Sequence, residues 1–277
     1  MAVRTSLLAP GIALILASQT AATPNADYRW LEGTVRRPLA QAIDPPAGFR
    51  RAEAPAASFA AWLRGLPLRE GRPPVRLFDG RPKPNQDAHH AVVEIDVGSR
   101  DLQQCADAVM RLRAEYLFAR GRAAEIRFHF TSGDLAAWQD WSTGMRPSVQ
   151  GNRVSWNRTA PADASYASFR RYLDAVFTYA GSMSLEKELT RVQDPAAIEI
   201  GDVFVRGGSP GHAVLVVDVA ANAAGERVFL IAQSYMPAQD IHVLRNPASA
   251  SSPWYGAARS GDLVTPEWTF RRTELRR

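Results

Sequence analysis

The sequence predicts an α+β protein, in which helices in the middle of the chain lead into an antiparallel sheet near its end. Two stretches with apolar residues at helical spacing cover residues 101–121 and 168–189. Three short apolar runs separated by glycine or asparagine turns cover residues 198–208, 212–220 and 227–235. The sequence contains no internal repeat and no long linker, so residues 23–277 are expected to form a single domain.

The first 22 residues have the pattern of a secretory signal peptide. Arg4 precedes an apolar run of eleven residues, LLAPGIALILA, and small residues follow it. This run is too short to span a bilayer, and cleavage is expected after Ala22. We therefore expect a secreted or periplasmic protein with no stable membrane insertion after cleavage.

The composition and charge of the chain indicate which binding partners to expect. The formal net charge is +5 and 46% of the residues are apolar, as in an ordinary globular protein whose mild basicity suits an anionic cell envelope. Arginines occur as scattered pairs without interleaved aromatics, so no nucleic-acid partner is expected. The GSPG loop at residues 208–211 lacks the lysine of a phosphate loop, and no cofactor is expected.

The first predicted elements lie between residues 58 and 97. Ser58 is expected to cap a short helix over residues 59–66. Its apolar residues at helical spacing are Phe59, Trp62, Leu63 and Leu66. Residues 91–97 alternate apolar and polar side chains, which indicates a half-buried strand.

The clearest helix is predicted over residues 101–121. Asp101 is expected as its N-cap, Gln104 as the capping-box partner three residues on, and Gly121 as its end. Cys105 lies on the apolar stripe of this helix. The stripe predicts that one face of the helix packs against the sheet.

Less regular segments follow. Residues 125–133 predict a strand, and the second helix, over residues 168–189, is expected to break at Gly181. Between them lies a section expected to be irregular, which contains Trp138, Trp141 and Trp156.

Cys105 is the sole cysteine, so it cannot form a disulfide within the chain. Near a helix start, free backbone N–H groups and the helix dipole stabilise a thiolate, which is the nucleophilic form. A lone cysteine on an apolar stripe also fits a plain core residue. Both interpretations stay open at this point.

His212 and Gln233 lie at equal distances from the turn expected around residues 222 and 223. Hairpin partners placed in this way face each other across the ladder. An imidazole can take the proton of a neighbouring thiol, and a polar third residue can orient the ring. We therefore expect a triad of Cys105, His212 and Gln233, with His242 as the alternative base.

Other parts of the site are expected nearby. The Cys105 amide is a candidate oxyanion donor, and the side-chain candidates are Gln103, Gln104 and Gln86. The candidate substrate-binding residues are Trp254, Tyr255 and Tyr235, of which the first two look most exposed.

The order of Cys105, GDVFV, GHAVLVVD and a polar residue on the next strand resembles the NlpC-type papain-like cell-wall peptidases. That resemblance implies a papain-like core, with the cysteine helix packed on an antiparallel sheet. It also implies that Cys105 is the nucleophile, His212 the base and Gln233 the orienting residue. The implied activity is a cysteine hydrolase acting on peptide or amide bonds of the cell envelope.

Three longer stretches resemble a bacterial family catalogued as domain of unknown function 4846, over nearly the full mature length. They are LQQCADAVMRLRAEYL, SPGHAVLVVDVA and AQSYMPAQDIHVL. This closer resemblance implies no activity.

Two rival interpretations remain. His89, His90 and Asp87 are close in sequence, but adjacent strand residues point to opposite faces, so no metal site is expected. Alternatively, a platform for sugar rings would make the chain a non-catalytic envelope ligand-binding protein, and its candidate residues are Trp138, Trp141, Trp156, Trp254 and Tyr255.

Overall fold

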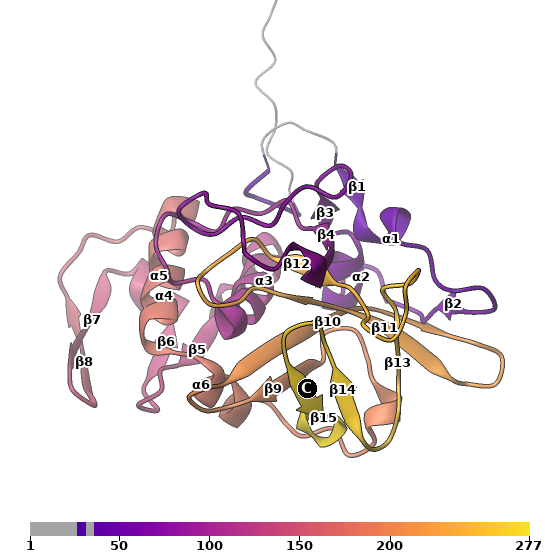
Figure 1. Cartoon of the computed structure of the whole chain (residues 1–277). Helices are drawn as coiled ribbons and strands as arrows, with labels where there is room; N and C mark the ends of the chain where they lie inside the picture. Colours follow the sequence, from indigo (N-terminus) through magenta and orange to yellow (C-terminus); the bar gives the residue numbers. More distant parts are fainter. Residues whose placement is uncertain (1–26, 32–35) are drawn as a thin grey trace, which may run out of the picture.

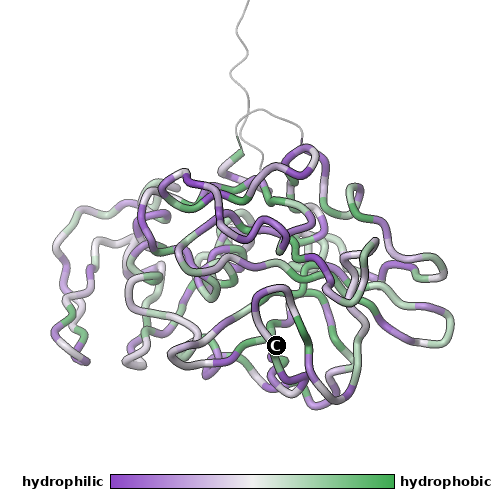
Figure 2. The backbone as a smooth tube through the Cα atoms, viewed as in Figure 1, coloured by the Kyte–Doolittle hydropathy of each residue, from purple (hydrophilic) through white to green (hydrophobic). Residues whose placement is uncertain are grey.

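A computed structural model describes residues 27–31 and 36–277, so the expected signal peptide lies outside the described residues. In Figure 1 the long strands lie at the centre, with α1 (Leu39–Ala42) at the upper right and α4 (Trp138–Ser142) and α5 (Tyr166–Tyr179) on the left. The hairpin of β7 (Met145–Gln150) and β8 (Arg153–Arg158) lies at the far left, beyond α4 and α5. Hydrophobic stretches lie on the central strands in Figure 2, while the outer loops are mostly hydrophilic. No helix in this described part of the chain has the length and apolar character that a membrane span requires.

A large antiparallel sheet forms the centre of the protein and confirms the three predicted C-terminal strands. Its main path runs β16-β9-β10-β11-β12-β4, with β2 paired to β10 and β13 paired to β11. These strands are β2 (Arg50–Arg51), β4 (His89–Val92), β9 (Val203–Arg206), β10 (His212–Ala221), β11 (Arg227–Gln233), β12 (His242–Leu244), β13 (Tyr255–Gly256) and β16 (Leu275–Arg276).

Four two-stranded sheets surround the large one. They pair β1 (Arg37–Pro38) with β3 (Pro67–Leu68), β5 (Arg127–His129) with β6 (Leu135–Ala137), β7 (Met145–Gln150) with β8 (Arg153–Arg158), and β14 (Asp262–Val264) with β15 (Thr269–Arg271).

Both faces of the central sheet are buried, so its strands are apolar on both sides. Along β10, Leu215 and Val217 belong to the core shared with the helices, whereas Val214 and Val216 belong to a second core. Phe270 from the β14–β15 hairpin lies in that second core. The C-terminal hairpin therefore covers the sheet face opposite α3.

The helices confirm most of the predicted pattern. Ser58 Oγ accepts a hydrogen bond from the Ala61 N–H as the cap of α2, and Gly181 separates α5 from α6. The α-helices are α1 (Leu39–Ala42), α2 (Phe59–Arg64), α3 (Cys105–Ala119), α4 (Trp138–Ser142), α5 (Tyr166–Tyr179) and α6 (Ser182–Glu188). Short 3-10 turns cover Gln86–Ala88, Ala123–Glu125, Pro195–Ala197 and Arg272–Glu274.

The predicted start of the cysteine helix is wrong. Helix α3 begins at Cys105, and its N-cap is Gln104 rather than Asp101. Asp101 Oδ1 instead accepts hydrogen bonds from Gln104 Nε2 and from the Ala238 N–H. Because the backbone N–H of Gln104 donates to Asp107 Oδ2 at 3.0 Å, the capping box lies three residues later than predicted.

The tryptophan-rich section is regular, against expectation. It contains α4 and the β7–β8 hairpin, and Trp138 and Trp141 are buried. Trp156 packs on the ring of Phe130. These three tryptophans hold elements together, and so they are not a platform for a ligand.

Candidate active site

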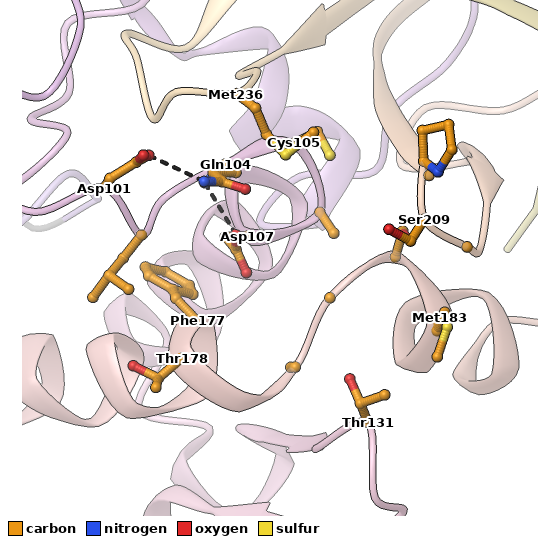
Figure 3. Close-up of a pocket in the computed structure, with 18 residues that line it drawn as sticks. Asp101, Gln104, Cys105, Asp107, Thr131, Phe177, Thr178, Met183, Ser209 and Met236 are labelled. Atoms are coloured by element: carbon orange, nitrogen blue, oxygen red, sulfur yellow. Dashed lines mark hydrogen bonds between the residues drawn. The ribbon is translucent and has the colours of Figure 1, made fainter.

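A pocket of about 460 Å³ opens at the N-terminus of α3 (Figure 3). Its other walls are the segment joining α5 to α6, the loop of residues 208–211 before β10, and Met236. Cys105 lines this pocket, although only 8% of the residue is exposed. The thiol therefore lies at a cleft and not in the closed core.

Cys105 is held against the start of β10. The backbone N–H of Ala213, the residue after His212, hydrogen-bonds the Cys105 sulfur and favours its thiolate. Burial outweighs this contact and, together with the Asp107 carboxyl, raises the pKa of the thiol to about 11. The expected thiolate is thus corrected, because a thiol with this pKa is neutral at pH 7.

The His212 ring is buried among aromatic side chains. Its centroid lies 4.8 Å from the Tyr235 ring and 5.3 Å from that of Trp268, and it stacks on Phe270 at 5.7 Å. Burial lowers the pKa of His212 to about 4, although the hydrogen bond to Gln233 opposes this shift. The imidazole is therefore neutral at physiological pH, as a general base must be.

His212 contacts Gln233 in a register different from the predicted one. Leu215 pairs with Ala232, which places Gln233 two residues away from the position opposite His212, and a bulge interrupts β10 between Val216 and Asp218. A shift of two residues keeps both side chains on the same sheet face, whereas a shift of one would not. The predicted contact is confirmed, because His212 Nε2 lies 2.9 Å from Gln233 Oε1.

Glu267 determines how the Gln233 amide is oriented. A carboxylate can only accept, so the amide nitrogen of Gln233 must face Glu267 Oε2, 2.8 Å away. The amide oxygen then faces His212 and accepts from its Nε2–H. This arrangement leaves the lone pair on His212 Nδ1, which is the nitrogen free to act as base.

Sequence reasoning missed Glu267 and its partner Lys83. The Lys83 ammonium forms an ion pair with Glu267 and lies 5.6 Å from the centroid of the Tyr235 ring. Lys83 is buried, which lowers the pKa of its ammonium. No local pattern identifies this pair, because its members are 184 positions apart and Glu267 lies in the turn between β14 and β15.

Cys105 approaches the start of β10 at Ala213, the residue after His212, while His212 itself does not line the Cys105 pocket. Ala213 belongs to the core beside α3, while the His212 ring packs on Phe270 in the core of the other face. Between these two described residues, Cys105 and His212, the structure places no direct hydrogen bond. Catalytic contacts are often long in empty sites and shorten when substrate binds.

Of the side-chain oxyanion candidates, only Gln104 lines the pocket, where its Nε2 donates to Asp101. Gln103 Oε1 instead accepts from Arg111 inside the core. Gln86 bonds the backbone of Val75 and Lys83, so it braces the loop that carries Lys83. Gln103 and Gln86 therefore stabilise structure away from the pocket.

His242, the predicted alternative base, lies against Gln233 and does not line the Cys105 pocket. Its Nδ1 donates to the Asp240 carbonyl at 2.8 Å, and its Nε2 lies 3.4 Å from Gln233 Nε2, which donates to it. Its full burial lowers its pKa well below the usual value. His242 thus supports the amide that orients His212.

Two predicted substrate-binding residues are corrected. Trp254 and Tyr255 are buried, at 4% and 3% exposure, and neither lines the Cys105 pocket. Trp254 Nε1 donates to the Asp44 carbonyl, and the Tyr255 hydroxyl donates to that of Arg245. Tyr235 is half-buried beside His212, and its pKa is raised by burial first, then by Glu267 and by Cys105.

His89 and His90, which are adjacent in sequence, have separate surroundings in the structure. His89 Nε2 lies 3.0 Å from the Pro73 carbonyl oxygen, and His90 lines a different pocket near Arg72. Among the residues with described positions, no group of three or more His, Cys, Asp or Glu side chains is arranged to hold a metal ion.

Comparisons with known proteins identify one family. The model of the family described as "Domain of unknown function (4846)" matches residues 39–277. No curated protein and no solved structure matched the chain.

Proposed function

Since the chain belongs to the domain of unknown function 4846 family, whose description carries no activity, we propose its function from the site itself. The proposal is a cysteine hydrolase that cleaves peptide or amide bonds of the cell envelope. One observation carries it: the sole cysteine begins a helix, lines a pocket and contacts the strand that begins with His212, whose Nε2 lies against Gln233.

The arrangement of elements supports a papain-like core of the NlpC type. Cys105 begins α3, His212 begins β10, and Gln233 ends the adjacent strand β11. A helix with its cysteine at the N-terminus, packed on an antiparallel sheet with histidine and a polar residue, has the same parts in the same order. Convergent sites are recognised by such geometry and roles.

The proposed reaction begins with a neutral pair. As Cys105 Sγ attacks the carbonyl carbon of the scissile amide, its proton passes to His212 Nδ1. His212 then gives this proton to the nitrogen of the leaving amine, and the C–N bond breaks to leave a thioester. A water molecule attacks the thioester while His212 takes its proton, and the returning proton restores the thiol as the carboxylic acid departs.

The negative charge on the carbonyl oxygen needs donors already in place. The Cys105 backbone N–H is the first donor, because a residue at the first helical position has no partner within the helix. Gln104 Nε2 is the candidate second donor, since it lines the same pocket and uses only one N–H for Asp101. Asp101 thereby positions Gln104.

The substrate and location rest on the leader and on charge. The pattern of residues 1–22 is that of a secretory signal, and the net charge of +5 suits an anionic envelope. The proposed location is therefore secreted or periplasmic. The proposed substrate is a cell-wall peptide or another envelope amide.

A second candidate is a non-catalytic envelope ligand-binding protein. The raised pKa of Cys105, about 11, favours it, because a neutral thiol is a poor nucleophile. In this alternative the pocket binds a ligand, and His212 and Gln233 are structural.

The test uses peptidoglycan-derived peptides and mass spectrometry to detect a released amine and an acyl adduct on the protein. The proposal expects both with the wild-type chain, and neither with Cys105→Ser. His212→Ala should lose the activity, while His129→Ala, at an exposed histidine, should keep it. Retained hydrolysis in Cys105→Ser would overturn the proposal, and peptide binding without adduct or cleavage would support the second candidate.

A further inference from the structure

The pocket beside Cys105 has an acidic lining, although the whole chain is basic. Of the described residues that line it, Asp101 and Asp107 are the charged ones, and none is lysine or arginine. The chain as a whole has 33 lysines and arginines against 28 acidic residues. Both carboxyl groups appear in Figure 3, at the N-terminal end of α3.

Asp107 has an unused oxygen. Its Oδ2 accepts from the Gln104 N–H, whereas its Oδ1 is buried without a hydrogen-bond partner among the described residues. The residue is only 6% exposed, yet it lines the pocket. A buried polar atom without a hydrogen bond destabilises the fold, so its presence at a pocket indicates a partner that arrives with a ligand.

The same pocket offers apolar contacts. Met183 and Met236 line it and are 40% and 52% exposed, which makes them two of the four exposed large hydrophobic residues described. Thr131, Thr178 and Met183 are shared with an adjoining pocket of about 520 Å³, so the cavity continues away from Cys105. A ligand that fits has an alkyl part as well as a cationic group.

We propose that this pocket is a specificity subsite for a primary ammonium group of the substrate, held by Asp107 with Asp101 at its rim. That a substrate occupies the pocket rests on the proposed hydrolase function. The ammonium donates to the free Asp107 Oδ1, and the methionines contact the adjoining alkyl carbons. An α-amino group and a lysine-type side chain share this chemistry.

Occupancy of the subsite changes the local electrostatics. Burial raises the pKa of Asp107 to about 8. The other titratable groups of the lining are Cys105 and Asp101, because the α5–α6 segment and the 208–211 loop contribute only uncharged residues. A bound ammonium favours the carboxylate, so binding near pH 7 releases a proton from Asp107.

The subsite also affects the nucleophile. An ionised Asp107 opposes the thiolate of Cys105. A bound ammonium neutralises the Asp107 carboxylate. A substrate with an ammonium group therefore makes ionisation of the Cys105 thiol easier. A substrate without this group lacks that compensation.

The experiment measures binding in full-length Cys105→Ala by calorimetry, so that its result does not depend on thiol chemistry. The probes are Ala-Ala-amide, which has an α-amino group, and acetyl-Ala-Lys-amide, which has a side-chain amine. Acetyl-Ala-Ala-amide and acetyl-Ala-norleucine-amide are their uncharged counterparts. At least one ammonium probe should bind tenfold or more tightly than its counterpart, and the better of the two identifies the source of the ammonium.

Adding Asp107→Asn to Cys105→Ala should remove this preference. The asparagine still offers an oxygen to the Gln104 N–H, and it resembles the protonated form of Asp107. Asp87→Asn, at a carboxylate with 89% side-chain exposure, is the matched control and should keep the preference. Equal binding of charged and uncharged probes would overturn the subsite.

Proton release is an independent readout if Asp107→Asn does not fold. Calorimetry of the preferred ammonium probe at pH 7, in buffers of different ionisation enthalpy, should show net proton release from Cys105→Ala. Binding without proton release would overturn the role of Asp107. Subsite binding in Cys105→Ala with no hydrolysis by the wild type would instead reject only the hydrolase.

Discussion

Glu267 orients the Gln233 amide through a hydrogen bond of 2.8 Å, and through it determines which nitrogen of His212 carries the proton. Glu267→Gln removes this constraint, because an amide can donate as well as accept. Gln233 can then turn over, and the His212 proton moves to Nδ1. We expect a changed tautomer in the nitrogen NMR spectrum of the ring. We also expect the proposed hydrolysis to fall by about 10² or more, as in catalytic triads whose histidine has the wrong tautomer.

Glu226→Gln is the control for that experiment, since Glu226 is exposed in the turn between β10 and β11 and accepts from Asn222. It should change neither the tautomer nor the hydrolysis. An unchanged tautomer in Glu267→Gln would contradict the assigned role of Glu267.

Gln233→Leu should destabilise the fold even where no substrate is present. The change leaves the Nε2 atoms of the buried His212 and His242 rings without Gln233, whereas Glu267 keeps its ion pair with Lys83. Each unsatisfied buried group costs about 1–3 kcal/mol, and the free energy of unfolding in urea measures the sum. Gln150→Leu, at an exposed position, should change it by less than about 0.5 kcal/mol.

Lys83 and Glu267 should show strong energetic coupling. Lys83→Met leaves a largely buried carboxylate unpaired, which costs about 3–5 kcal/mol. Adding Glu267→Gln removes that charge, so the double variant should lose less unfolding free energy than the two single changes added together. Additive losses in urea unfolding would show that the ion pair does not act as a unit.

His212 should make the protein less stable in acid. Its folded pKa of about 4 lies below the unfolded value of 6.5, so the unfolded chain binds the proton more tightly. The contribution of neutral His212 to the free energy of unfolding is fully present above pH 6.5. It is lost as the pH falls toward 4, and the loss is at most about 3 kcal/mol. Unfolding free energies of the wild type and His212→Asn, measured from pH 7 to 4, should therefore converge at low pH.

A comparison with His129→Asn separates His212 from general acid effects, because His129 is exposed. That variant should follow the wild-type profile. A constant difference between wild type and His212→Asn across this pH range would exclude the linkage.

Gly211→Ala should disturb the pocket wall. A Cβ at this position would lie 2.7 Å from the Gly208 carbonyl oxygen and 2.8 Å from that of Arg206, and it would also meet Ser182. The backbone must shift, at an expected cost of about 1–3 kcal/mol in urea unfolding and with weaker ligand binding. Gly256→Ala, with no atom within 4 Å of the new Cβ, is the control and should change neither.

Local patterns in the sequence were enough to predict the elements that carry the proposed triad. Apolar runs predicted β9, β10 and β11, and the proximity of His212 to Gln233 followed from hairpin parity. The predicted contact between His212 and Gln233 is present although the register differs by two residues, because a shift of two residues keeps a side chain on the same face of the sheet. The helix start was misplaced because Asp101 bonds Ala238, a residue far away in sequence.

Only the tertiary structure decided what surrounds those side chains. Packing of the C-terminal hairpin brings Glu267 to Gln233 and Lys83, and the walls around Cys105 come from segments far from α3 in sequence. Burial, in turn, makes the thiol and imidazole neutral and encloses Trp254. Periodicity and capping are local and can be read along the chain, whereas desolvation and long-range contacts exist only once separate elements pack together.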